Sequence, residues 1–135
     1  MILTTDLQEI RNVFRGLETL YETYLPKIDP ALIHNLLIHE QVKAERAPFY
    51  MVEVFTKQGT STQWCKDHIW STCRSVPAIY DNGTHYATNM RLTCDILKKL
   101  NDFDFVIDVS GDYTGSPCGT GASHERRVQT GSRNL

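Results

Sequence analysis

Residues 76–100 read VPAIYDNGTHYATNMRLTCDILKKL, and this stretch decides the fold. Asn82-Gly83 stands between two runs of strand-forming residues. Because Asn and Gly tolerate positive φ at low cost, such a pair is a strong short-range signal for a β-hairpin. The pattern therefore predicts that strand Ala78–Tyr80 turns back as strand Thr84–Thr88. A helix follows at once, and its apolar face carries Leu92, Ile96, Leu97 and Leu100.

The segment before residue 50 has the periodicity of two helices. In Thr5–Tyr24 apolar residues recur at steps of three and four, which is typical of an amphipathic helix. These residues are Leu7, Ile10, Val13, Phe14, Leu17, Leu20, Tyr21 and Tyr24. Asp29-Pro30 then opens a second helix, because Asp is a preferred N-cap and Pro is tolerated at the first helical position. Pro48 ends it, and we expect the two helices to form a hairpin that covers the sheet.

The rest of the chain predicts two more strands and a helix between them. Tyr50–Thr56 is dense in strand formers. Ser61 or Thr62 caps a helix that runs to about Cys73, and Phe103–Val109 forms a last strand. From Gly111 onward the chain is rich in glycine and poor in apolar residues, which is typical of a flexible segment.

The element order after the helical hairpin is β-α-β-β-α-β, the order of ferredoxin-like domains. We therefore predict an α+β fold with one antiparallel sheet and two helices on one of its faces. The predicted organisation is an N-terminal helical hairpin at 1–48, a ferredoxin-like core at 49–111 and a Gly-rich, flexible tail at 112–135. This reading rests on the order of elements alone, so it predicts no function.

A second fold follows from a resemblance. Residues 75–83, SVPAIYDNG, resemble the segment around the cis-proline of thioredoxin and glutaredoxin proteins, and residues 54–57, VFTK, resemble their first strand. The resemblance implies an abbreviated thioredoxin-like fold with a cis bond before Pro77. Where that family carries Cys-x-x-Cys, residues 59–63 read GTSTQ. The alternative is therefore a redox-inactive member of that family.

Composition limits the classes of function. The chain has 135 residues, enough for one domain, and no apolar run approaches the ~18 residues that a membrane-spanning helix needs. Its formal net charge of −2 and the absence of an RNA-stacking motif argue against nucleic-acid binding. The N-terminus does not resemble a secretory signal, so we expect a cytoplasmic protein with reduced cysteines. We predict no cofactor, no metal and no membrane or nucleic-acid partner.

The strongest candidate site lies on the sheet face away from the helices. If Val52 and Val54 face the helices, alternation places Glu53 on the other face, together with Asp108 and either His85 or Tyr86. Neighbouring carboxylates and a histidine in an apolar setting are suited to acid–base catalysis. The alternative is that the helical hairpin or a second subunit covers this face and the charges serve only the structure.

Three further groups of residues are candidates. Cys65, near the start of a helix, is either a nucleophile whose pKa the helix dipole lowers or a buried structural thiol. The aromatic residues Phe55, Tyr80 and Tyr86 could contact a ligand on the sheet. Arg126 and Arg127 follow Gly119-x-Gly121 and could bind a phosphate, although a mobile tail explains the same composition.

Two classes of function follow. In the first, the protein is a small binding or regulatory module that self-associates, or docks a protein or a small ligand, through the sheet face and its aromatic surface. In the second, it is a small enzyme with an acid–base or thiol site formed by Glu53, His85, Asp108 or Cys65.

Overall fold

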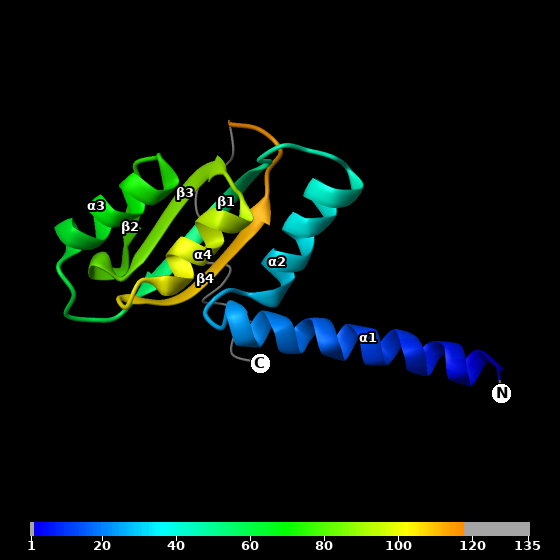
Figure 1. Cartoon of the computed structure of the whole chain (residues 1–135). Helices are drawn as coiled ribbons and strands as arrows, with labels where there is room; N and C mark the ends of the chain where they lie inside the picture. The colour runs from blue at the N-terminus through cyan, green and yellow to red at the C-terminus, as the bar shows by residue number, and fades with distance from the viewer. Residues whose placement is uncertain (1, 118–135) are drawn as a thin grey trace.

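The computed structural model describes residues 2–117, and the side chains of this range from Thr5 onward. It is an α+β structure built on a four-stranded antiparallel sheet, which confirms the predicted class (Figure 1). The order of the strands in the sheet is β2-β3-β1-β4. The core contains β1 (Phe49–Thr56), α3 (Thr62–Cys73), β2 (Ala78–Tyr80), η2 (Asp81–Gly83), β3 (His85–Arg91), α4 (Cys94–Asp102) and β4 (Val106–Tyr113).

Three helical elements precede the sheet: α1 (Ile2–Tyr24), α2 (Pro30–Leu37) and η1 (Ile38–Val42), of which η1 is a π-helix. The side chain of Asp29 accepts a hydrogen bond from the backbone N–H of Ala31, so the predicted cap of α2 is confirmed. The N–H of Asp29 also donates to the carbonyl oxygen of Val109 at 2.8 Å, which fixes the start of α2 to strand β4.

Alternation along β1 separates the two faces of the sheet. Val52 and Val54 are fully buried in one apolar cluster with residues of α3, α4 and α2. Figure 1 shows α3 and α4 on this face, with α2 along the β4 edge. Glu53, between the two valines, points to the opposite face, where its neighbours in the register are Ala87 and Ser110. The predicted assignment of faces therefore holds for β1.

The hairpin lies where Asn82-Gly83 predicts it, but its turn is longer than a two-residue loop. Tyr80 pairs with His85, so four residues connect β2 and β3. Asp81, Asn82 and Gly83 all adopt positive φ, at 53°, 57° and 84°. Strand β3 consequently begins at His85, one residue later than predicted, and continues to Arg91.

The last strand is displaced toward the C-terminus relative to the prediction. It covers Val106–Tyr113 rather than Phe103–Val109, because the register with β1 pairs Val52 with Gly111 and Tyr50 with Tyr113. A Cβ atom at Gly111 would lie 2.6 Å from the carbonyl oxygen of Met51, so this position requires glycine. Residues 112 and 113 belong to the sheet and not to the tail.

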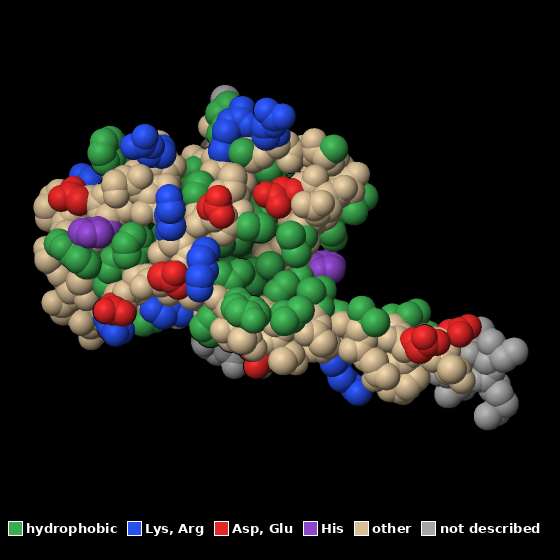
Figure 2. Space-filling view, in the orientation of Figure 1, with side chains coloured by type: hydrophobic (Ala, Val, Ile, Leu, Met, Phe, Trp, Pro, Cys, Tyr) green, Lys and Arg blue, Asp and Glu red, His purple; other side chains and the backbone are tan. Residues whose placement is uncertain are grey.

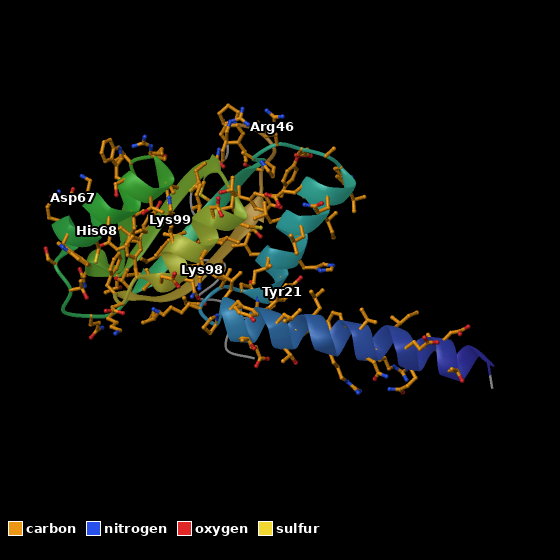
Figure 3. The ribbon with its side chains drawn as sticks, in the orientation of Figure 1. Tyr21, Arg46, Asp67, His68, Lys98 and Lys99 are labelled. Atoms are coloured by element: carbon orange, nitrogen blue, oxygen red, sulfur yellow. The ribbon has the colours of Figure 1, made fainter. Side chains whose placement is uncertain are left out.

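Helix α1 differs most from the prediction. It does not cover the sheet with α2 but projects away from the body of the molecule (Figure 1). Of its side chains from Thr5 onward, only Tyr21 is buried, and Tyr21 lies at the base of the helix (Figure 3). The two helices of the predicted hairpin therefore have different roles: α2 is part of the core, whereas α1 extends from it.

The thioredoxin-like alternative implies a cis peptide bond before Pro77, and the structure does not have one. Every peptide bond in the described range is trans, including the bond between Val76 and Pro77. None of the helices in that range is both long enough and apolar enough to cross a lipid bilayer.

Candidate functional site

A histidine and a glutamate meet on the sheet face opposite α3 and α4. Nε2 of His85 lies 2.9 Å from Oε1 of Glu53, and both side chains are fully buried. The two residues come from neighbouring strands, and His85 sits diagonally across from Glu53 in the register. Such a pair can pass a proton between an imidazole and a carboxylate, which is the basic requirement of acid–base chemistry.

His85 also faces a second carboxylate and two aromatic rings. Its Nδ1 atom lies 3.6 Å from Oδ2 of Asp81, which is exposed in the turn. The ring of Phe55 stacks on the imidazole with centroids 4.4 Å apart, and the ring of Tyr80 lies 5.2 Å away. The imidazole therefore lies between a buried carboxylate and one that contacts solvent, and Phe55 fixes its orientation.

The other predicted residues lie in different surroundings. Asp108 is half-buried on the same face as Glu53, where it pairs with Phe55 in the register. Tyr86 lies instead in the core, where its hydroxyl donates to the carbonyl oxygen of Gly83 at 2.8 Å. Burial raises the pKa of Tyr86 to about 12. A ligand on the open face cannot reach a side chain in this position.

The predicted thiol site has no support in the structure. Cys65 is fully buried in the core, and burial raises the pKa of its thiol above the ordinary value, although a hydrogen bond with Tyr86 opposes this effect. Both properties are those of a structural cysteine rather than a nucleophile. Arg126 and Arg127 lie outside the described residues, so the predicted phosphate site in the tail stays a prediction.

One polar cluster was not predicted from the sequence. Nδ1 of His39, in the π-helix η1, lies 3.1 Å from Oε1 of Glu45, and the imidazole stacks on Tyr113 with centroids 3.7 Å apart. The hydroxyl of Tyr113 donates to Glu45 at 3.0 Å. Hydrogen bonds, first from His39 and then from Tyr113, lower the pKa of Glu45. No short-range pattern links His39 to Tyr113, because only the sheet brings them together; the cluster ties η1 to the end of β4.

The largest unusual feature of the surface is helix α1. Its exposed apolar side chains are Leu7 (50%), Ile10 (64%), Val13 (73%), Phe14 (56%), Leu20 (53%) and Tyr24 (62%). Figure 2 shows that this apolar surface continues from α1 onto the body of the molecule. Monomeric soluble proteins rarely expose a contiguous apolar surface of this extent, so it indicates an interaction site.

Within residues 2–117, no group of three or more His, Cys, Asp or Glu side chains is arranged to hold a metal ion. Among known proteins, no family model, no curated protein and no solved structure matches the chain significantly. Any assignment of function must therefore come from the residues themselves.

Proposed function

We propose that the protein is a self-associating module in which α1 pairs with α1 of a second copy, while the α+β core carries the ligand-binding surface. The single observation that carries the proposal is the exposed apolar face of a helix that stands clear of the core. Its 23 residues, at ~1.5 Å per residue, extend about 34 Å, and of its side chains from Thr5 onward only Tyr21 is buried.

The apolar residues of α1 have the spacing of a coiled coil. Leu7, Ile10, Phe14, Leu17, Tyr21 and Tyr24 follow one another at alternating steps of three and four. A repeat of 3.5 residues on average keeps such residues on one face of the helix, where they can form a seam with a partner helix. In heptad terms, Leu7, Phe14 and Tyr21 occupy a positions, and Ile10, Leu17 and Tyr24 occupy d positions.

The residues beside the seam favour an antiparallel pair of identical helices. In that arrangement Phe14 packs on Leu17 of the second copy, whereas Tyr21, at the base of α1, stays buried in its own core. Arg11 then faces Glu18 of the second copy on one flank, and Val13 faces Leu20 on the other. By symmetry each contact occurs twice, as a two-fold interface requires. A parallel pair would instead set Val13 against Glu18, which places an apolar side chain beside a charge.

The finer description of the core is also part of the proposal. We infer a ferredoxin-like arrangement, which two observations support. The elements from β1 to β4 follow the order β-α-β-β-α-β, apart from the short turn η2. In addition, β3 lies between β1 and β2, and β1 lies between β3 and β4, so each helix joins strands that are separated by another strand.

Sedimentation equilibrium of the full chain, from about 1 to about 100 µM, tests self-association. We expect a dimer, and we expect Phe14→Asp to shift the protein to a monomer because it places a charge in the seam. Arg15→Glu is the matched control: it changes an adjacent, exposed side chain on the polar side of α1 and should leave the dimer intact. A wild-type protein that stays monomeric at the highest concentration would refute the proposal.

Charge exchange tests the direction of the helices. Arg11→Glu and Glu18→Arg should each weaken the dimer a few-fold through like-charge repulsion. The double variant restores opposite charges in an antiparallel pair and should recover the wild-type dissociation constant. In a parallel pair Arg11 faces Asp6, so the double variant would not recover it. In a parallel pair Glu18 faces Val13, so a dimer that Arg11→Glu weakens and Glu18→Arg does not, without recovery in the double variant, would indicate the parallel arrangement.

The contact between Glu53 and His85 favours a second function, acid–base catalysis on the sheet face. If this function is present, hydrolysis of p-nitrophenyl acetate should exceed the buffer rate, and His85→Gln should abolish the excess. His34→Gln, at an exposed histidine of α2, is the control for adventitious imidazole catalysis. A rate equal to that of buffer, or equal loss in both variants, would argue against catalysis at His85.

A further inference from the structure

A cavity of about 450 Å³ opens away from both α1 and the Glu53–His85 pair. The end of α3, the end of β3, the start of α4 and the segment before β1 form its walls. Its size falls within the range of about 300–1,000 Å³ that is usual for small-molecule sites. It is larger than a single inorganic ion needs, so it fits an organic molecule.

The charge of the walls is one-sided. Arg74 and Arg91 line the cavity, and none of the described residues that line it is Asp or Glu. Figure 2 shows Lys and Arg side chains gathered at this end of the molecule, where Figure 3 places Arg46. The chain as a whole has a formal net charge of −2, so this local excess of positive charge is not a consequence of composition.

The guanidinium of Arg91 is held in place by the protein. It lies over the ring of Phe49, 4.6 Å from the centroid, and its Nη1 atom donates to the carbonyl oxygen of Ala47 at 3.1 Å. Among the described residues, its Nε and Nη2 atoms have no hydrogen-bond partner. Arginine in a fixed orientation with donors to spare is suited to bidentate recognition of phosphate or carboxylate.

The second arginine occupies a position where glycine would be more stable. Arg74 forms the C-cap of α3 in the left-handed conformation, with φ 59° and ψ 32°. Glycine is the usual residue at such helix ends, because a Cβ atom is unfavourable in the left-handed conformation. Ala47, which also lines the cavity, has φ 50°. Two residues with unfavourable backbone conformations thus lie in the walls of one cavity, a feature that is frequent at ligand sites.

The remaining walls explain what else a ligand would need. Phe49, Met90 and Ile96 supply apolar surface, and Thr93 lies at the N-terminal end of α4, where the helix dipole favours negative charge. We infer that this cavity binds a small organic anion, with Arg74 and Arg91 pairing with its phosphate or carboxylate group and the apolar wall contacting its body. This inference does not depend on how α1 assembles.

Chemical-shift titration of the ¹⁵N-labelled full chain tests the inference with three probes: phenyl phosphate, benzoate and benzyl alcohol. We expect at least one of the two anions to shift the amides of Arg74, Ser75, Arg91 and Thr93, and benzyl alcohol to bind at least about tenfold more weakly. The difference between phenyl phosphate and benzoate identifies the preferred anionic group. Failure of both anions to shift these amides at about 10 mM would overturn the inference, as would equal binding of the neutral probe.

Substitution of the arginines identifies the groups that bind. Arg74→Gln should weaken binding of the anion about tenfold, because it removes a charge-assisted hydrogen bond and one positive charge from the cavity wall. Arg91→Lys keeps the charge but loses the planar fork and should also weaken binding. Arg15→Gln, on the polar side of α1, is the control and should bind as the wild type does. Unchanged affinity in Arg74→Gln would contradict the assigned role of that residue.

Discussion

Helices α1 and α2 follow one another in the chain and carry similar apolar stripes, but the stripe of α2 is buried and that of α1 is largely exposed. In α2, the exposed fraction is at most 3% for Leu32, Ile33 and Leu36. The exposed apolar side chains of α1 have an exposed fraction of at least 50%. The comparison teaches that a stripe predicts that a face will be covered, but not which molecule covers it. In α2 the cover is β4 of the same chain; for α1 we propose a second copy.

The connection before α2 explains the difference. Residues 27–29 lie beside β4: the N–H of Val109 donates to Lys27, and the N–H of Asp29 donates to Val109. These bonds set the direction of α2 along the edge of the sheet. At the base of α1, Lys98 donates to the carbonyl oxygen of Tyr24 at 3.4 Å and Tyr21 is buried, so only the last turns of α1 contact the core.

Truncation of one leucine in each helix gives the largest expected contrast. Leu36→Ala removes a fully buried side chain and should lower the free energy of unfolding by about 2–5 kcal/mol. Leu20→Ala changes a half-exposed side chain and should lower it by less than about 1 kcal/mol under monomeric conditions. Urea denaturation followed by circular dichroism measures both. Equal losses would mean that α1 packs on its own core in solution.

The effects of the same two variants on self-association should be reversed, with Leu20→Ala having the larger effect. Leu20 faces Val13 of the second copy in the proposed antiparallel pair, so Leu20→Ala should weaken the dimer while Leu36→Ala leaves it unchanged at temperatures where the chain is folded. Sedimentation equilibrium decides this, and a dimer that responds only to Leu36→Ala would place the interface on the core.

Much of the fold was predictable because its signals are local. Strand Ala78–Tyr80, the turn at Asn82-Gly83, the caps Asp29 and Ser61 and the alternation of β1 all depend on residues close in sequence. The choice between His85 and Tyr86 on the site face stayed open for a physical reason. One residue more or less in a hairpin loop moves every following side chain to the other face. The four-residue connection resolved it in favour of His85.

What could not be predicted depends on contacts between distant residues. Val106–Tyr113 could be placed only through its register with β1, and Gly111 signals a close approach to Met51 only once the pairing is known. The Arg74–Arg91 cavity and the His39–Glu45–Tyr113 cluster likewise join segments that the chain order separates. For α1 the heptad spacing was present in the sequence, but a helix that covers its own sheet can have the same spacing. The spacing therefore does not predict which surface the helix contacts.

Removal of the cap of α2 should have an intermediate effect. Asp29→Ala leaves the first N–H groups of α2 without their side-chain acceptor and should lower the free energy of unfolding by about 1 kcal/mol. Asp29→Asn is the matched variant, because asparagine caps helices nearly as well, and it should retain most of the stability. Urea denaturation measures both variants. If Asp29→Asn loses as much as Asp29→Ala, the carboxylate charge rather than the cap is what fixes α2.

The smallest expected effect on stability comes from replacing a glycine in the exposed helix α1, compared with a glycine in a turn with positive φ. A Cβ atom at Gly16 of α1, or at Gly59 of the turn after β1, would meet no atom within 4 Å. The two positions differ in backbone conformation: Gly59 has a positive φ of +86°, whereas Gly16 does not have a positive φ. Gly16→Ala should therefore raise the helical circular-dichroism signal, with a local gain of about 0.5–1 kcal/mol, and leave the global unfolding midpoint nearly unchanged. Gly59→Ala should lower that midpoint, because alanine is strained at positive φ. A large shift of the midpoint in Gly16→Ala would mean that α1 unfolds together with the core, which would remove the distinction between the two helices.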